Sequence, residues 1–446
     1  MNKKKEIKAL KGQIVYSESS NKLKICENGY LVYEANKIKG AYPTLPKEYE
    51  GILVDDYGDR IIVPGFVDLH VHAPQYVFRG LGMDMELLDW LETNTFPEES
   101  KYKDIIYAKK AYQMFVDNLK KSATTRACIF ATIHKESTIL LMDMLEKAGL
   151  ATMVGKVNMD RNSPDYLREE TEESVNETIS WLEEVQKKQY QHTRPILTPR
   201  FIPSCTDELM HKLKNIQAKY QIPVQSHLSE NYGEIAWVQE LCPKSEFYGD
   251  AYDQFGLFGR DSKTVMAHCV HSDENEIRRM KENGVFIAHC PESNTNLSSG
   301  VAPIRQYLKE GMHVGLGSDV AAGSTENMFV AMRYAVQASK LRWRLKDEKL
   351  TQLTMPEVFY MATTGGGEFF GKVGSFEAGY EMDAVVLDDK RLIHPQEMNV
   401  EQRLERMIYL VDEREVYAKY VAGEKGIFTK KLHSKINISS TRRNNK

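Results

Sequence analysis

Residues 64–72 read PGFVDLHVH and place His70 and His72 two positions apart within an apolar run. A short apolar run that follows proline and glycine is typical of a buried strand. Because side chains alternate along a strand, both imidazoles lie on one face, where they can bind the same metal ion. Two imidazoles alone do not complete a zinc site, so we expect other parts of the chain to supply further ligands.

Seven more apolar runs follow this one, and most are succeeded by a charged, amphipathic stretch such as residues 207–220 or 273–284. Alternating strand and helix signals predict a parallel sheet, and eight such strands predict an α/β fold of the (β/α)8 TIM-barrel type. The eight runs are VPGFVDLHV (63–71), TTRACIF (124–130), ATMVGKV (151–157), ILTPRFI (196–202), PVQSHL (223–228), TVMAHCV (264–270), VFIAHC (285–290) and HVGLGS (313–318).

The two ends of the chain carry a β-rich pattern. Near the N-terminus short β-like runs alternate with polar turns, which favours a small antiparallel β element over a βα unit. Similar runs return in DAVVLDD (383–389), MIYLV (407–411) and EVYAKYVAGEKGIF (415–428). We expect the two ends to pair into one small β-sandwich domain. The predicted parts are residues 1–64 and 376–428 for this domain, 65–375 for the barrel, and 429–446 for a polar, basic tail.

The composition of the 446-residue chain, 42% hydrophobic and 27% charged, is typical of a globular protein with a sizeable core. Its 59 basic and 63 acidic side chains leave a net charge of −4, which gives no reason to expect nucleic acid or an anionic membrane as a partner. No apolar stretch approaches the roughly 20 residues of a membrane span. The six cysteines are scattered without a C-x-x-C pair, so we expect reduced thiols and a cytoplasmic protein.

Three later strands also end in side chains that suit a metal site. His227 lies in the fifth strand, with Glu230 three residues further on. His268 lies in the sixth strand, and Asp319 follows the eighth. Barrel active sites form at the carboxyl ends of the strands, so these side chains should converge with the first histidine pair. Imidazole and carboxylate groups bind zinc, which can make water nucleophilic near neutral pH, and the pattern predicts a hydrolytic site.

The segments PGFVDLHVH, HLSE, AHC, IAHCPESN and GLGSDV resemble, in this order, the amidohydrolase superfamily over roughly residues 60–390. Within that superfamily the chain is similar to the guanine deaminases. This narrower resemblance rests on HAPQY (72–76), LLDWLETNTFPEE (87–99), FATIH (130–134) and TPRFIPSC (198–205). It implies a metal-dependent hydrolase that converts guanine and water into xanthine and ammonia.

The resemblance also implies the metal and its ligands. It predicts one zinc ion per chain, with iron or manganese left open, held by His70, His72, His227 and Asp319. TPRFIPS contains no lysine where members with two metals carry a carbamylated one, and this favours a single ion. The histidine that matches His268 contacts the metal-bound water or the substrate in this superfamily.

The residues expected to be catalytic are Glu230, His268 and Asp319. Glu230, beside a predicted ligand, is expected to protonate ring atom N3 while water attacks C2, and then to pass a proton to the departing amine. Asp319 is expected to accept the proton of the attacking water. The alternative for Glu230 is an exposed glutamate at a strand end.

For the substrate pocket the resemblance assigns Gln75, Arg200 and Phe201. A guanidinium is a permanent donor suited to a carbonyl oxygen, an amide can read ring nitrogens, and a phenyl ring can stack on a base. The alternatives are a structural salt bridge for Arg200 and a core position for Phe201. The substrate is also expected to contact four side chains of the metal and proton-transfer sets, His72, His227, Glu230 and Asp319.

Two other functions stay open. One is the same machinery acting on an adenosine derivative, cytosine or a triazine, which Arg200 and segments 72–75 and 90–99 argue against. The other is a non-catalytic barrel that binds metal, which the complete ligand set argues against. The resemblance further implies a homodimer with a small purine as its partner. His271, His289 and the basic tail receive no role.

Overall fold

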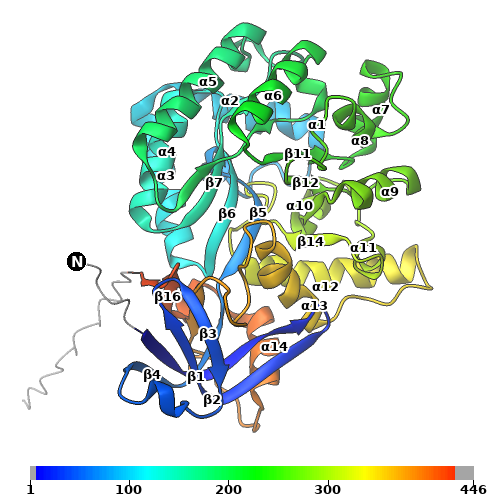
Figure 1. Ribbon diagram of the computed structural model, residues 1–446. Helices are drawn as coiled ribbons and strands as arrows, with labels where there is room; N and C mark the ends of the chain where they lie inside the picture. Colours follow the sequence, from blue (N-terminus) through cyan, green and yellow to red (C-terminus); the bar gives the residue numbers. More distant parts are fainter. Residues whose placement is uncertain (1–6, 427–446) are drawn as a thin grey trace, which may run out of the picture.

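The computed structural model describes residues 7–426 (Figure 1). The upper part in this view holds short strands flanked by helices, and the lower part holds a β-sheet formed from both ends of the described chain. The predicted basic tail, residues 429–446, lies outside the described residues.

Each of the eight predicted apolar runs contains a strand, and all pairings among these strands are parallel. β5-β6-β7-β9 form one sheet, β11-β12-β13-β14 form a second, and β8 pairs with β10. The prediction of parallel strands that alternate with helices is confirmed. The strands are β5 (Phe66–His72), β6 (Thr124–Phe130), β7 (Ala151–Gly155), β8 (Val157–Asn158), β9 (Thr193–Pro195), β10 (Thr198–Pro199), β11 (Val224–Leu228), β12 (Thr264–His268), β13 (Phe286–His289) and β14 (His313–Leu316).

Backbone contacts also connect these sheets at their edges. Leu197 forms a parallel bridge with Val224, the first residue of β11. The N–H of Asp319 donates to the carbonyl oxygen of His70 at 2.8 Å. The segment after β14 therefore lies beside β5, and this contact brings the first histidine pair next to Asp319.

The helices between the strands begin and end where the sequence provides caps. The predicted helix at 207–220 is α6, whose preceding Thr206 accepts a hydrogen bond from the N–H of Leu209. The stretch 273–284 contains α9, which ends at Gly284 with a φ of 65°. The α-helices are α1 (Leu87–Trp90), α2 (Phe96–Ser100), α3 (Ile105–Lys121), α4 (Lys135–Ala148), α5 (Thr171–Lys188), α6 (Asp207–Tyr220), α7 (Tyr232–Leu241), α8 (Tyr248–Asp253), α9 (Glu274–Asn283), α10 (Pro291–Asn296), α11 (Ile304–Lys309), α12 (Met328–Leu345), α13 (Met355–Tyr360) and α14 (Val400–Leu410). Short 3-10 turns are η1 (Lys47–Tyr49), η2 (Ala73–Phe78), η4 (Lys101–Lys103), η5 (Asp165–Leu167), η6 (Ile202–Ser204) and η8 (Glu413–Glu415), and π-helical turns are η3 (Leu91–Thr95) and η7 (Met361–Gly365).

Strands from both chain ends share one seven-stranded sheet, in the order β17-β16-β15-β4-β1-β2-β3. The sheet curls on itself, since the ring of Tyr33 in β2 lies 6.5 Å from the ring of Tyr420 in β16. Its two layers thus come from one curled sheet. Its strands are β1 (Ile7–Ser19), β2 (Lys22–Glu34), β3 (Lys37–Tyr42), β4 (Leu53–Pro64), β15 (Ala384–Leu387), β16 (Val416–Val421) and β17 (Glu424–Lys425).

The structure departs from the predictions about the chain ends at two places. The antiparallel pairing predicted there is found in every strand pair of this sheet except one. β1 and β4 pair in parallel, because the chain crosses from β3 at one edge to the far side of β1 before β4 begins. MIYLV is the end of helix α14 and not a strand. Its apolar side chains continue a helical spacing, in which Leu404, Met407 and Ile408 are buried and Leu410 is exposed.

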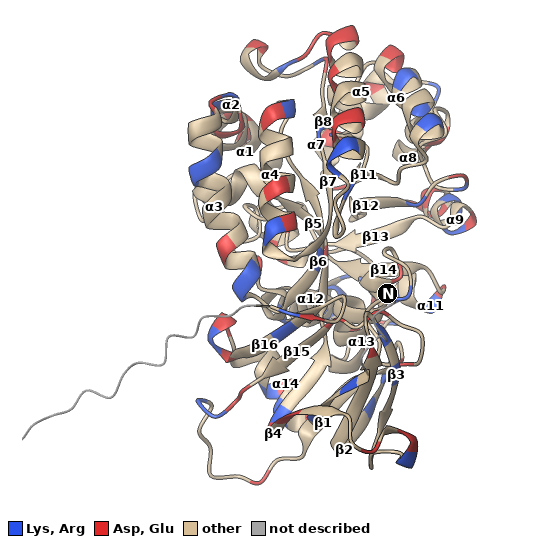
Figure 2. Cartoon of the chain, turned by 60° about the vertical axis from the view of Figure 1, so that its left-hand side comes forward, with Lys and Arg blue, Asp and Glu red and all other residues tan. Residues whose placement is uncertain are grey.

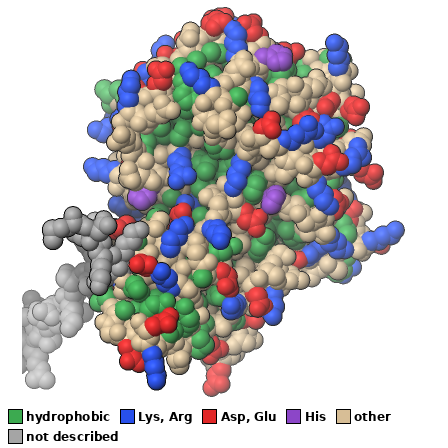
Figure 3. Space-filling view, in the orientation of Figure 1, with side chains coloured by type: hydrophobic (Ala, Val, Ile, Leu, Met, Phe, Trp, Pro, Cys, Tyr) green, Lys and Arg blue, Asp and Glu red, His purple; other side chains and the backbone are tan. Residues whose placement is uncertain are grey.

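The surface shows no concentration of one charge on the faces drawn. Acidic and basic residues alternate along the outer helices in Figure 2, and their side chains are interspersed over the face drawn in Figure 3. Within residues 7–426, no helix combines the length and the apolar character that crossing a membrane requires.

Candidate active site

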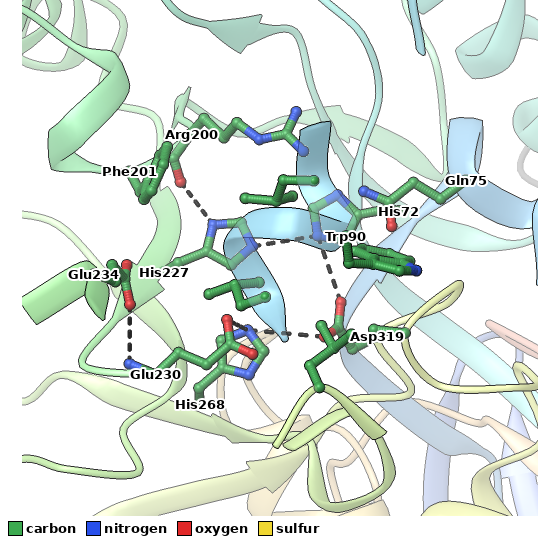
Figure 4. Close-up of a pocket in the computed structure, with 14 residues that line it drawn as sticks. His72, Gln75, Trp90, Arg200, Phe201, His227, Glu230, Glu234, His268 and Asp319 are labelled. Carbon is green, nitrogen blue, oxygen red and sulfur yellow. Dashed lines mark hydrogen bonds and ion pairs between the residues drawn. The ribbon is translucent and has the colours of Figure 1, made fainter. Parts of the chain in front are cut away.

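A cavity lies among the carboxyl ends of the parallel strands (Figure 4). Every residue predicted to contact substrate lines it, together with His268. The predicted ligand His70 is buried just outside the lining, at 2% exposure. The lining residues are His72, Gln75, Leu87, Trp90, Leu91, Arg200, Phe201, His227, Glu230, Glu234, His268, Leu297, Asp319 and Ala322.

The four predicted metal ligands meet beside this cavity. Nε2 of His72 lies 3.2 Å from Nε2 of His70 and 3.2 Å from Nε2 of His227. Oδ1 of Asp319 lies 3.2 Å from Nε2 of His70. Ligands at about 2.0–2.1 Å around a tetrahedral zinc ion would lie roughly 3.3 Å apart. The donor atoms therefore have the separation that a shared divalent ion requires.

Two further side chains reach the same donors. Among the described residues, ligand atoms lie within 4.8 Å of one another in a group of His70, His227 and His268, and in a group of His70, Cys290 and Asp319. The geometry thus leaves room for His268 to approach a bound ion.

Two of the predicted histidine ligands are held neutral, and a backbone contact fixes the ring of one of them. Burial, reinforced by the neighbouring His70, holds the pKa of His72 and of His227 well below the ordinary value. Both are therefore neutral, which is the form that binds metal. Nδ1 of His227 lies 2.6 Å from the carbonyl oxygen of Arg200. A proton on Nδ1 donates to that oxygen and leaves the Nε2 lone pair for a metal.

Asp68 and Gly317 hold the strand ends together, and the sequence analysis gave neither a role. Oδ1 of buried Asp68 accepts the N–H of His70 at 3.2 Å and the N–H of Ser318 at 2.9 Å. A Cβ at Gly317 would lie only 2.9 Å from the Cβ of His70. The missing side chain therefore allows the close approach that places Asp319 beside the histidines.

Glu230 lies at the other side of the centre and is 3% exposed. Its Oε2 lies 3.3 Å from Nε2 of His268, and its Oε1 accepts the hydroxyl of Ser299 at 2.9 Å. Burial, partly offset by His268, raises the pKa of Glu230 to about 7. Such a carboxyl can take up and release a proton near neutral pH. Its burial excludes the alternative of an exposed glutamate.

His268 stands between two carboxylates. Its Nδ1 lies 2.8 Å from Oδ1 of Asn294, and its Nε2 lies 3.8 Å from Oδ2 of Asp319 as well as close to Glu230. Burial opposes protonation of His268, but the two carboxylates outweigh it and raise the pKa. His268 and Asp319 both have positive φ angles, 76° and 47°. Non-glycine residues rarely adopt this conformation, and it is enriched at functional sites.

Arg200 and Gln75 line the cavity and share a buried partner, Glu99 of α2. Nη1 and Nη2 of Arg200 donate to Glu99 at 2.6 Å and 3.2 Å, and Nε2 of Gln75 donates to Glu99 at 2.9 Å. Arg200 thus combines the predicted place in the pocket with the salt bridge that was its alternative. Phe201 is buried and also lines the cavity.

The walls of the cavity are largely apolar. Leu87, Trp90 and Leu91 come from the segment after β5, and Leu297 follows α10. Apolar walls with a few convergent polar groups are typical of small-molecule sites. The resemblance singled out the first of these segments, but it gave no role to Trp90 or to Glu234, whose carboxylate accepts the hydroxyl of Tyr248 at 2.7 Å.

The two histidines without a predicted role lie outside the cavity lining. Nε2 of His271 lies 2.6 Å from the carbonyl oxygen of Ser299, the residue whose hydroxyl donates to Glu230. The ring of His271 stacks on Tyr232, with centroids 3.9 Å apart. His289 is buried in β13.

The family model described as "Amidohydrolase family" matches residues 61–425, well over half of the chain. The chain belongs to the amidohydrolase family. Several relatives align with this amidohydrolase over most of their own length. A guanine deaminase from Dictyostelium discoideum is 36% identical, over 95% of this chain and 99% of its own. A guanine deaminase from Mus musculus is 40% identical, over 82% of each chain.

A solved structure is similar over nearly the whole amidohydrolase. It is a guanine deaminase from C. acetobutylicum with guanine bound in the active site. The two chains are 48% identical and superpose with a TM-score of 0.92, covering 95% of this chain and 100% of the other. The resemblance to guanine deaminases therefore extends from short motifs to the full described fold.

Proposed function

We propose that this amidohydrolase catalyses the hydrolysis of guanine to xanthine and ammonia. The observation that carries the proposal is one cavity in which the proton-transfer groups face a polar edge formed by Arg200 and Gln75. Figure 4 shows Arg200 and Gln75 on one side of the histidines, and Glu230 with His268 on the other. Relatives that are guanine deaminases and match most of the chain support this substrate.

The scaffold that we propose is a closed (β/α)8 barrel with a small β domain. The bridge between Leu197 and Val224 and the bond between Asp319 and His70 support closure, because they extend the pairing beyond each four-stranded sheet. The domain boundaries follow the sequence analysis: residues 65–375 for the barrel, and 1–64 with 376–428 for the β domain.

The metal site that we propose holds one divalent ion, zinc, between His70, His72, His227 and Asp319. Three neutral imidazoles and one carboxylate form a donor set that suits zinc, and the separations of 3.2 Å between them support a single shared ion. A zinc ion bound there would supply the Lewis acidity that makes water nucleophilic near neutral pH.

Proton transfer in this proposal belongs to Glu230 and Asp319. Protonated Glu230 donates to N3 of guanine as water adds at C2. The resulting carboxylate then takes the proton of the new C2 hydroxyl group and delivers it to the departing amine, and the proton taken from water returns to Glu230 at the end of the cycle. Asp319 accepts the proton of the attacking water. His268 lies within 3.3 Å of Glu230 and 3.8 Å of Asp319, so its charge can stabilise both carboxylates and the substrate edge between them.

Recognition of the purine falls to the opposite side of the cavity. Arg200 donates to the 6-oxo group, Gln75 reads the adjacent ring edge, and Phe201 packs against the ring. His72, His227, Glu230 and Asp319 contact the reacting half of the base. The apolar residues near the mouth, Trp90 among them, exclude water from the bound ring.

Another heterocyclic amine as substrate, or a metal-binding barrel without activity, would contradict this proposal. The test is release of ammonia from guanine, adenine, cytosine and an aminotriazine by the purified protein. Ammonia from guanine above all others supports the proposal. Preference for another amine would reassign the substrate, and no release from any of them by zinc-loaded protein would leave only a binding function.

Two further features of the proposed enzyme follow from family resemblance and cysteine usage. We expect a homodimer in the cytoplasm. All six cysteines are free thiols, which suits a reducing compartment. Sedimentation of the purified protein tests the dimer directly.

A further inference from the structure

A buried ion pair lies directly behind the substrate side of the cavity. Arg200 and Glu99 are 3% and 2% exposed, and their closest atoms, Nη1 and Oε2, are 2.6 Å apart. Arg200 lines the cavity, whereas Glu99 does not. The Glu99 carboxylate thus contacts Arg200, which lines the cavity, but does not line the cavity itself.

The same carboxylate fixes the amide of Gln75. Nε2 of Gln75 donates to Oε1 of Glu99 at 2.9 Å, and Oε1 of Gln75 accepts the N–H of Ala321 at 3.2 Å. The amide nitrogen of Gln75 therefore has an acceptor as its partner, and the amide oxygen has a donor. A flipped amide would place its oxygen against the Glu99 carboxylate, and neither group could donate. Gln75 presents one defined donor and acceptor pattern to the cavity.

We propose that Glu99 is a positioning residue that makes this site selective for a neutral, oxo-substituted heterocycle over an anionic one. It orients Arg200 and Gln75, and it cancels the charge of Arg200 at the place where the oxo group binds. The inference rests on the proposed function, in which Arg200 and Gln75 contact the substrate.

The physical reason is the contrast between a paired and an unpaired guanidinium. An unpaired buried arginine is a strong site for a carboxylate, which it binds through two parallel hydrogen bonds. Glu99 already occupies that role on Arg200. Because a guanidinium carries five N–H donors, enough remain for a single neutral carbonyl oxygen. A second carboxylate would have to lie close to Glu99 in a buried site, where like charges repel strongly.

The test compares two purines that are not expected to react. Hypoxanthine is neutral and keeps the 6-oxo group but lacks the 2-amino group, and purine-6-carboxylate carries an anion at the same position. Their dissociation constants are measured by calorimetry with zinc-loaded wild type and with Glu99→Gln. The matched control is Glu98→Gln, since Glu98 is its buried neighbour in α2 and bonds to Lys101 and Tyr107 instead.

The expected result is a shift in opposite directions. Glu99→Gln should bind hypoxanthine about tenfold or more weakly, and purine-6-carboxylate about tenfold or more tightly, because a buried charge has lost its partner. KM for guanine should rise more than kcat falls. Glu98→Gln should stay within about twofold of wild type in the dissociation constants of hypoxanthine and purine-6-carboxylate and in KM for guanine. If Glu99→Gln bound hypoxanthine and purine-6-carboxylate more weakly to the same extent, the inference would be overturned. It would also be overturned if Glu99→Gln and Glu98→Gln showed the same affinities.

A second variant keeps the test decisive if Glu99→Gln fails to fold. Glu99→Asp retains the charge but is one methylene shorter, so it cannot hold both Gln75 and Arg200. It should raise KM for guanine without any gain in binding of the carboxylate, and unchanged guanine kinetics would contradict the proposal. Because calorimetry needs no turnover, absence of guanine turnover by the wild type would refute the proposed function alone.

Discussion

The carbonyl oxygen of Arg200 lies 2.6 Å from Nδ1 of His227. One residue therefore serves both halves of the site: its backbone orients a proposed metal ligand, and its side chain faces the proposed substrate. A substitution at position 200 removes the second contact and keeps the first. This separation allows metal binding and substrate selection to be tested independently.

Arg200→Ala should raise KM for guanine strongly and leave the zinc content unchanged. Loss of the donor to the 6-oxo group leaves a buried acceptor unpaired, which costs roughly 1–3 kcal/mol and corresponds to a rise of about 5- to 150-fold in KM. Steady-state kinetics and metal analysis check both parts. Arg194→Ala is the control, because Arg194 lies in β9, shortly before Arg200 in the sequence, and is exposed. Zinc loss in Arg200→Ala, or wild-type activity on adenine that equals activity on guanine, would refute this role.

His70→Ala should lower the zinc content from about one equivalent per chain, because it removes one of four proposed ligands. The loss should appear in metal analysis after dialysis, together with loss of ammonia release. His313→Ala serves as a control, since His313 is exposed at the opposite end of a strand, the start of β14. Two zinc equivalents that both support activity would contradict the single-ion site.

Glu230→Gln should retain zinc and bind guanine but lose about 100- to 10,000-fold in kcat. The amide has nearly the same shape as the carboxyl group but cannot carry a proton. Single-turnover kinetics combined with metal analysis separate this effect from unfolding, and the exposed Glu282 provides a glutamate-to-glutamine control. A variant that keeps more than about a third of the wild-type rate would exclude Glu230 as the acid–base group.

Much of this site follows from the sequence, because parallel strands that alternate with helices bring their carboxyl ends to the same edge of a sheet. The positions of His70, His227 and Asp319 could be predicted once eight strands were recognised. The role of Glu99 could not be predicted. Glu99 lies in α2, in the segment that follows β5 in the sequence, and its contact with Arg200 joins positions far apart in the chain, so no local pattern indicates it. The strand predicted at 407–411 is a helix in the structure, because a run of five apolar residues fits the repeat of a helix as well as that of a strand.

Glu146 offers a test of stability against pH away from the active site. Its carboxylate accepts three backbone N–H groups, from Gln191, His192 and Thr193, at 2.8, 3.0 and 2.9 Å. Burial alone would raise the pKa of Glu146, but these bonds outweigh it and hold the pKa below the ordinary value of 4.5. A depressed carboxyl pKa gives stability that is present above the unfolded value and is lost as pH falls through the folded one.

The Tm of Glu146→Gln should therefore lie below that of the wild type at neutral pH, and the gap should narrow on acidification. Scanning calorimetry from about pH 7 to about pH 3 measures it. Glu136→Gln, at an exposed position of the same helix α4, should show no such convergence. A gap that stays constant over the whole range would show that the bonds of Glu146 do not depend on its charge.

A zinc-dependent site that deaminates guanine can be tested with purified protein, by following guanine absorbance and ammonia first as isolated, then after chelation, and then after zinc is restored. We expect equimolar xanthine and ammonia, loss of turnover on chelation and recovery with about one zinc per chain. Turnover that survives complete removal of metal, or zinc-loaded protein that leaves guanine unchanged, would contradict this assignment.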